Sequence, residues 1–98
     1  MAYGVILRFE GVGVDEYWAV NDRLGVQRDG TGDWPAGLVT HLGGPTDGGL
    51  VVTEVWATKA DQEAFMAERL GAALGEVGVP PPAQVIEFEV DNHQDPGR

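Results

Sequence analysis

The chain has 98 residues and no cysteine, and sixteen Asp and Glu residues against six Lys and Arg residues give it a formal net charge of −10. This acidic balance argues against binding to nucleic acid or to an anionic membrane, because both need clustered basic residues. No apolar run approaches the roughly 20 residues that span a bilayer, and no secretory signal pattern is present. We expect a cytoplasmic protein with one domain over residues 1–90 and a polar C-terminal tail over residues 91–98.

The first third of the chain predicts a strand, a helix and a long loop. Within Tyr3–Phe9, every second residue from Tyr3 onward is apolar and lies on one side of an extended chain, which is typical of a strand with one strongly apolar face. Apolar residues then recur at helical spacing over about Asp15–Leu24, with Asp15 as an N-terminal cap or first-turn acid and Gly25 as the stop. Residues 26–36 are rich in Gly, Asp and other turn formers, which predicts a loop.

The rest of the chain predicts a hairpin, a second helix and a last strand. Leu38–Gly43 and Leu50–Ala57 are apolar segments joined by Gly44–Gly49, which contains an Asp-Gly step that favours a hairpin turn. Thr58 resembles a helix cap, and an apolar stripe follows along Lys59–Val77 until Gly78 and three prolines end the helix. The last strand is expected over Gln84–Val90, as an alternating segment.

The element order βαββαβ predicts an α+β, ferredoxin-like protomer, a four-stranded antiparallel sheet with two helices on one face. The uncovered face would keep apolar side chains from the first and last strands. A domain of this size also has a thin core of its own. We therefore expect a homodimer in which two such faces pack together.

Two segments carry a resemblance to a known family: Gly37–Gly49, which reads GLVTHLGGPTDGG, and Val55–Phe65, which reads VWATKADQEAF. They resemble the antibiotic biosynthesis monooxygenase superfamily, and the similarity covers nearly the whole chain. The resemblance implies a ferredoxin-like protomer and a dimeric α/β barrel formed by two sheets. The superfamily includes cofactor-free oxygenases of aromatic polyketides, haem-degrading monooxygenases, quinol oxygenases and small proteins without assigned activity, so the fold does not select a reaction.

No cofactor or metal is expected. Haem-degrading members have an Asn on the first strand, a Trp at the end of the third and a His on the second helix. Trp56 matches the Trp, but Leu7 lies near the first position and residues 59–77 contain no histidine. Two histidines far apart, His41 and His93, and no cysteine make a zinc site improbable, and no nucleotide-binding glycine pattern is complete.

His41 is the candidate catalytic residue. It is the one histidine inside a predicted element, and histidine is the side-chain type that exchanges protons near neutral pH. The alternative is a hydrogen-bonded structural histidine. The side of the sheet on which His41 lies depends on the hairpin register, since a shift of one residue would reverse it.

The candidate substrate-binding residues are aromatic or polar side chains of the predicted elements: Trp56, Trp18, Trp34, Asn21, Arg8 and Glu54. An aromatic-lined cleft with a few polar groups suits a flat hydrophobic ligand. Glu54 and Trp56 share one strand face, which the resemblance turns toward the helices. Trp56 is equally explained as a core anchor.

The other candidates also have structural alternatives. Trp34 lies in a loop and needs cover from a partner subunit, a lid contact or a ligand. Asn21 interrupts an apolar stripe and needs a backbone carbonyl or a substrate oxygen as a partner. Arg8 either pairs with Glu54 across the sheet or binds an enolate or phenolate oxygen.

These residues predict a small cofactor-independent monooxygenase-like enzyme that acts on a hydrophobic aromatic or polyketide-like molecule. The alternatives are a cyclase or isomerase on the same fold, or a non-catalytic dimeric binding or accessory protein. An enclosed pocket that holds His41 would favour the enzyme, and a filled interface between helices and sheet would favour the accessory protein.

Overall fold

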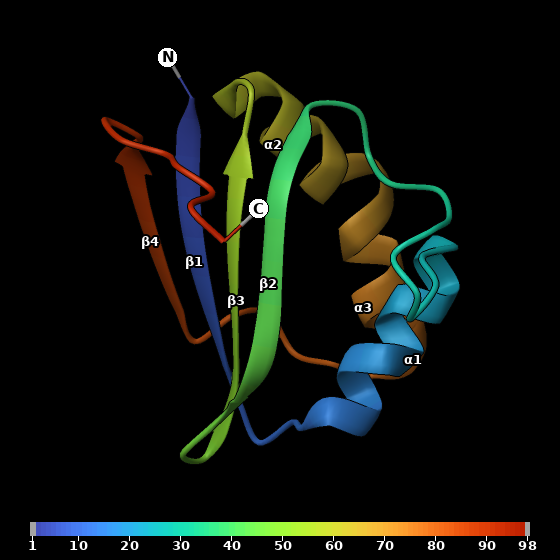
Figure 1. The fold of residues 1–98 in the computed structure, drawn as a ribbon. Coiled ribbons are helices and arrows are strands. Elements are labelled where there is room, and N and C mark those ends of the chain that lie inside the picture. The colour runs from blue at the N-terminus through green and yellow to red at the C-terminus, as the bar shows by residue number, and fades with distance from the viewer. Residues whose placement is uncertain (1, 98) are drawn as a thin grey trace.

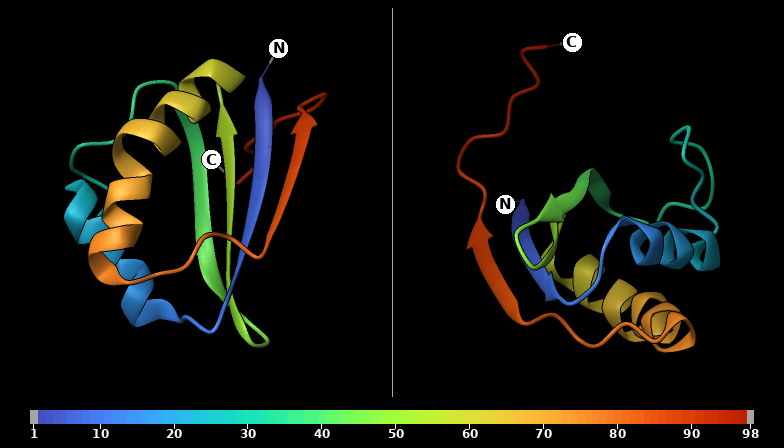
Figure 2. Two further views of the ribbon diagram at one scale, coloured as in Figure 1. Left: turned by 180° about the vertical axis from the view of Figure 1, so that it is seen from behind. Right: turned by 90° about the horizontal axis from the view of Figure 1, so that it is seen from below.

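A computed structural model describes residues 2–97. Its elements, in chain order, are β1 (Tyr3–Glu10), α1 (Val14–Leu24), β2 (Leu38–Thr46), β3 (Gly49–Trp56), α2 (Lys59–Phe65), η1 (Met66–Leu70), α3 (Gly71–Val77) and β4 (Gln84–Glu89). The strands form one sheet in the order β2-β3-β1-β4, and every neighbouring pair is antiparallel. The helices all cover one face of this sheet (Figures 1 and 2). The ferredoxin-like α+β protomer predicted from the sequence is confirmed.

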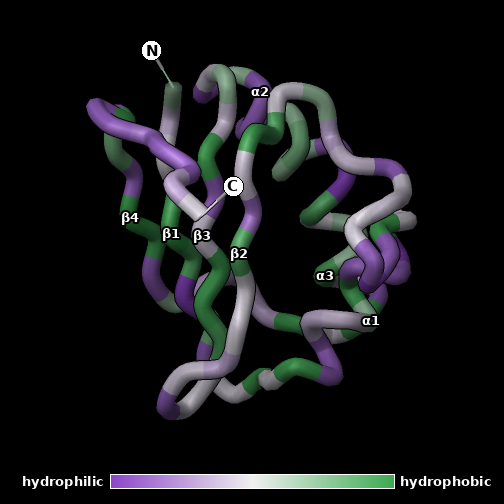
Figure 3. Tube along the Cα trace, viewed as in Figure 1, coloured by the Kyte–Doolittle hydropathy of each residue, from purple (hydrophilic) through white to green (hydrophobic). Residues whose placement is uncertain are grey.

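The core lies between the sheet and the helices, because the strands alternate as predicted. Along β1 and β3, every second side chain is buried: Tyr3, Val5, Leu7, Phe9, Leu50, Val52, Glu54 and Trp56. The helices add their apolar stripes on the other side, with Val20 from α1 and Phe65, Leu70 and Leu74 from the second helical region. Figure 3 shows continuous apolar stretches along the central strands β1 and β3.

Helix α1 begins one residue before the predicted start. Gly13 is the N-cap, and its backbone N–H donates to the Glu16 carboxylate at 2.8 Å. Asp15 is therefore a first-turn acid, where its charge suits the positive end of the helix dipole. The helix ends as predicted at Gly25, whose φ of +81° is the left-handed conformation that closes many helices.

The second helix has the predicted limits but is not one regular α-helix. Thr58 caps it, because its hydroxyl accepts from the backbone N–H of Asp61 at 3.1 Å. A π-helical turn, η1, separates α2 from α3, and the backbone N–H of Gly71 donates to the carbonyl of Met66, five residues earlier. Apolar periodicity predicts where a helix begins and ends but not such a shift in its hydrogen bonding.

The predicted hairpin joins β2 and β3 through Asp47 and Gly48, with Gly48 at a φ of +76°. Strand β2 extends to Thr46, three residues beyond the predicted end, because residues 44–46 continue to pair with β3. Pro45 is tolerated there because β2 is an edge strand. Near its start, β2 contains a bulge: Leu38 pairs with Trp56 and Thr40 with Val55, which leaves Val39 without a partner.

The open face of the sheet carries apolar residues from the central and edge strands. On β4, Ile86 pairs with Ile6 and Phe88 with Gly4, and both β4 side chains are more than two-fifths exposed. The Phe88 ring packs over Gly4, since a Cβ there would lie 2.3 Å from the ring and would displace it. Residues 91–97 form no helix or strand and lie on this side of the sheet (Figures 1 and 2), where the His93 ring contacts the Thr40 hydroxyl at 3.1 Å. Among residues 2–97, no helix has the length and apolar character needed to cross a membrane.

Candidate active site

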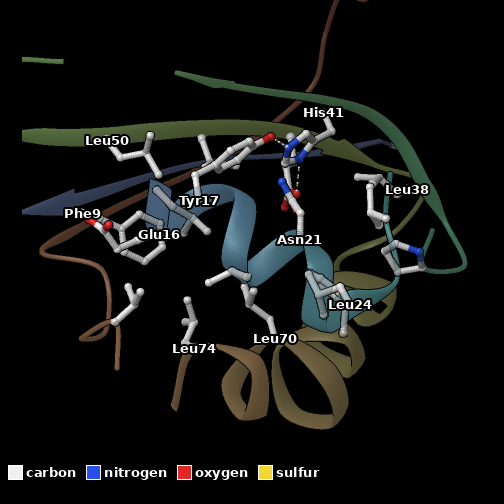
Figure 4. Close-up of a pocket in the computed structure, with 18 of the residues that line it drawn as sticks. Phe9, Glu16, Tyr17, Asn21, Leu24, Leu38, His41, Leu50, Leu70 and Leu74 are labelled. Atoms are coloured by element: carbon white, nitrogen blue, oxygen red, sulfur yellow. Dashed lines mark hydrogen bonds and ion pairs between the residues drawn. The ribbon is translucent and has the colours of Figure 1, made fainter. Parts of the chain in front are cut away.

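A cavity of about 60 Å³ lies between α1, the sheet and the second helical region. Most of its wall is apolar and comes from β1, β3 and the helices, including Leu7, Phe9, Leu50, Val52, Leu70 and Leu74. The polar residues of the wall are Glu16, Tyr17, Asn21, His41 and Glu54. Figure 4 shows that Tyr17 and Asn21 reach from α1 toward His41 on β2.

The hairpin register places His41 on the helix side of the sheet, directly opposite Glu54. Because of the bulge at Val39, both Leu38 and His41 face the helices, although three positions separate them. The imidazole Nδ1 lies 2.8 Å from the Glu54 carboxylate, and the His41 side chain is only 16% exposed. The sequence alone did not decide on which face of the sheet His41 lies; the structure places it on the face that lines the cavity.

The Tyr17 hydroxyl contacts the other ring nitrogen of His41. Its hydroxyl lies 2.5 Å from the His41 Nε2 atom, and the two rings are nearly parallel, with 16° between their planes. Gly43, next to His41 on the same face of β2, makes this position available. A Cβ at Gly43 would lie 2.7 to 2.9 Å from the Tyr17 ring and hydroxyl. Tyr17 is therefore packed directly against the backbone of β2.

Glu54 is nearly buried, yet both of its oxygens have partners. Oε2 contacts His41, and Oε1 accepts from the indole N–H of Trp56 at 3.2 Å. Trp56 is fully buried, and its ring packs against Phe65 with centroids 5.4 Å apart. Trp56 does not belong to the cavity wall. Its indole N–H positions the Glu54 carboxylate, which in turn positions the His41 ring.

The chemical nature of the Glu54 carboxylate decides which atom donates and which accepts in each hydrogen bond of this group. An ionised carboxylate only accepts, so Glu54 selects the tautomer of His41 in which Nδ1 carries the hydrogen. The Nε2 atom then accepts from the Tyr17 hydroxyl. The result is a continuous chain, Tyr17 to His41 to Glu54, in which a proton can move from the tyrosine end toward the carboxylate.

Two further predicted residues, Asn21 and Trp34, also line the cavity. Asn21 is 7% exposed, and its side chain lines the cavity beside His41. Trp34 lies 5.6 Å from His41 between ring centroids, and its indole N–H donates to the Gly30 carbonyl within the same loop. The Asn21 amide is thus a polar group of the wall that can contact a ligand.

The structure places Trp18 and Arg8 away from this site. Trp18 packs edge-on against Tyr17 and under the Arg28 guanidinium, outside the cavity wall. Arg8 lies on the open face of the sheet and pairs with Glu10 at 2.9 Å. The expected pair between Arg8 and Glu54 is wrong, because strand alternation puts the two side chains on opposite faces.

Tyr17 is not among the site residues predicted from the sequence. Its spacing from Asn21 contains a usable signal, since residues at i and i+4 of a helix share a face. A tyrosine hydroxyl on a face that also carries a buried amide needs a polar partner. Only the packing of α1 on β2 identifies that partner as His41.

No family model matches the chain, and no curated protein matches it. The solved structures that share its fold include the following three. A candidate antibiotic biosynthesis monooxygenase from Chloroflexus aurantiacus J-10-fl has a TM-score of 0.63 and 16% identity, over 96% of this chain and 98% of that one. A structural-genomics protein named YJCS has a TM-score of 0.64 and 7% identity, over 93% and 100%. A protein of unknown function from Nitrosomonas europaea has a TM-score of 0.63 and 17% identity, over 97% and 92%. At these identities the likeness concerns the fold.

Proposed function

We propose that this protein is a small cofactor-independent monooxygenase-like enzyme that acts on a hydrophobic, hydroxylated aromatic or polyketide-like molecule. The observation that carries the proposal is the Tyr17–His41–Glu54 chain at the wall of an otherwise apolar cavity. A base in an apolar site favours proton removal when the resulting anion is delocalised over a ring. The likeness to a candidate antibiotic biosynthesis monooxygenase supports the same reading.

In the proposed reaction, the enol form of an aromatic ketone loses its hydroxyl proton to the chain that includes His41. The electron-rich ring carbon then forms a bond with dioxygen, and the peroxide takes up the proton. Loss of water breaks the O–O bond and leaves a carbonyl on that carbon. One ring CH₂ and one O₂ thus give one C=O and one H₂O, and no external reductant is needed. The Asn21 amide would stabilise the oxyanion by hydrogen bonding.

The size of the cavity sets a condition on this proposal. At about 60 Å³ it is well below the engineered cavity of roughly 150 Å³ that binds benzene. A ring therefore enters only when part of the wall moves. We assign this movement to the loop of residues 25–37, because it contributes Trp34 and Pro35 to the wall and contains no named helix or strand.

Oxygen uptake with anthrone as the probe tests the function. We expect the wild-type protein to convert anthrone to anthraquinone with one O₂ consumed for each molecule. His41→Gln should slow this reaction about 100-fold or more, which is the usual contribution of a general base. His93→Gln is the matched control, because the other histidine lies in the tail on the open face.

Wild-type uptake no faster than that of His41→Gln would contradict the oxygenase. Conversion of a substrate without oxygen uptake would instead indicate the cyclase or isomerase. Binding without conversion would indicate the non-catalytic binding protein.

A homodimer belongs to the same proposal. The open face presents Leu42 on β2 and Ile86 and Phe88 on β4, all more than two-fifths exposed. Exposed apolar side chains on both edge strands of one sheet face are consistent with an interface there. Two open faces packed together would bury these side chains while leaving the cavity on the helix side of each protomer.

A further inference from the structure

Both nitrogens of the His41 ring are already occupied. Nδ1 faces the Glu54 carboxylate at 2.8 Å, and Nε2 faces the Tyr17 hydroxyl at 2.5 Å. A ligand in the cavity therefore reaches no free imidazole nitrogen. The oxygen of Tyr17 is the end of the chain that can exchange its proton with a ligand, since Tyr17 itself lines the cavity.

We propose that Tyr17 is the catalytic residue that contacts the ligand, and that the ligand is an uncharged planar ring with a weakly acidic hydroxyl. His41 and Glu54 are then positioning residues that receive the proton behind Tyr17. The inference rests on the proposed function for the location of the site. It concerns proton transfer to a bound hydroxyl, which can be measured without turnover.

The reaction consists of two coupled proton transfers. The ligand O–H proton moves to the Tyr17 oxygen as the Tyr17 hydroxyl proton moves to His41 Nε2. The ligand becomes an anion, Tyr17 remains neutral, and His41 becomes an imidazolium. The Glu54 carboxylate on Nδ1 stabilises that positive charge, and the Trp56 indole N–H holds the second carboxylate oxygen in place.

The charges of the cavity wall explain why we expect an uncharged ligand. Two carboxylates, Glu16 and Glu54, belong to the wall, and no Lys or Arg within residues 2–97 does. The Glu16 side chain is bound to the N-terminal end of α1 through the Gly13 N–H. A carboxylate or phosphate ligand would therefore meet repulsion and find no cation, whereas a neutral ring meets mainly apolar side chains. A second oxygen on the ring would have the Asn21 amide as its partner.

Tyr17 is held in one place, as a relay requires. Its ring lies on the backbone of Gly43 and nearly parallel to the His41 ring. The Trp18 ring packs edge-on at 5.0 Å between centroids on its other side. These contacts keep the hydroxyl aligned on Nε2 without any contribution from a ligand.

Spectroscopic titration with 4-nitrophenol tests the inference, because only its phenolate is yellow. At a fixed neutral pH, saturation of the probe with wild-type protein should increase the phenolate absorbance. Tyr17→Phe should abolish this increase. It should weaken probe binding by about tenfold or less, the equivalent of one hydrogen bond. His41→Gln should also abolish the increase.

Tyr3→Phe is the matched control, since it removes the other tyrosine hydroxyl of the chain. Tyr3 is buried outside the cavity and bonded to Glu87; burial, with that bond and the nearby carboxylates, raises the pKa of its phenol, so it stays protonated. Its loss should leave the absorbance increase intact.

A Tyr17→Phe protein that still ionises the probe would overturn the inference, as would a wild-type protein that does not bind or ionise it. Thermal unfolding by circular dichroism verifies that each variant is folded, and Tyr17→Trp provides a second variant if Tyr17→Phe unfolds. Failure of the oxygenase proposal gives a different result, ionisation of the probe without oxygen uptake from anthrone.

Discussion

Glu54 shows how a single buried charge is made tolerable in this small core. Its side chain is nearly inaccessible, and an unpartnered carboxylate in such a place is strongly destabilising. His41 and Trp56 each contact one oxygen, so the carboxylate is satisfied on both sides. Trp56 therefore has two roles, packing the core against Phe65 and fixing the charge behind His41.

Replacement of Trp56 by Phe tests both roles. The change removes a fully buried indole and the N–H that donates to Glu54, so we expect a loss of about 2 to 4 kcal/mol in unfolding free energy. In a domain of this size that corresponds to a melting temperature lower by roughly 10 to 25 °C. Differential scanning calorimetry measures it. Trp18→Phe, outside the cavity and half-buried, is the control and should cost much less. Equal losses in the two variants would contradict the role given to Trp56.

The loop between α1 and β2 is attached to the second helical region by one side chain. Arg69 of η1 donates to the carbonyls of Leu24 and Asp33 at 2.8 and 2.7 Å. The Leu24 carbonyl is one of the groups that a helix C-terminus leaves without a helical partner. The loop ends are also tied to each other, because the Asp33 N–H donates to the Gly25 carbonyl.

We expect Arg69→Met, which keeps an apolar stem but removes the donors, to loosen this loop. Hydrogen–deuterium exchange should become faster at the Gln27 and Asp33 amides, both of which are bonded within the loop. Global stability should fall by about 1 to 3 kcal/mol. Arg23→Met is the control, since Arg23 is exposed and lies 4.0 Å from Asp22. Unchanged exchange in Arg69→Met would show that other contacts hold the loop.

At the scale of the whole molecule, the two faces of the sheet differ. The helices cover one face, and the other carries apolar side chains with only the tail beside it (Figure 2). This asymmetry follows from the element order, because both crossover helices pack on the same side of the sheet. A domain of under 100 residues gains core by association.

Sedimentation equilibrium at micromolar concentration should show a mass of twice 10.4 kDa. Ile86→Glu, on the open face of the edge strand β4, should give a monomer, because the proposed interface would then bury one carboxylate from each protomer. Val14→Glu is a matched control, with 43% exposure against 44% for Ile86 but a position on α1. A wild-type monomer, or a dimer that survives Ile86→Glu, would contradict the proposed interface.

Several features of the fold could be predicted from the sequence because they depend on neighbours along the chain. The alternation over Tyr3–Phe9, the Thr58 cap and the Asp-Gly turn of the hairpin each follow from local periodicity or local backbone preference, and the structure confirms them. The bare apolar face follows from the order of those elements. The N-cap of α1 at Gly13 and the π-helical turn were missed because they depend on one-residue shifts that periodicity does not resolve, whereas the end of α1 at Gly25 was predicted.

The sequence by itself determined the element order, the buried faces of β1 and β3, and a short set of polar candidates that included His41, Glu54 and Asn21. Only the tertiary structure decided which of them meet. The bulge at Val39 and the register of β2 on β3 turn His41 toward Glu54, and the packing of α1 over Gly43 adds Tyr17. These contacts join residues 13 and 24 positions apart, and their geometry depends on strand register and helix packing. Local sequence preferences contain no information on the His41–Glu54 contact or the Tyr17–His41 contact, because each is set by the packing of separate elements against one another.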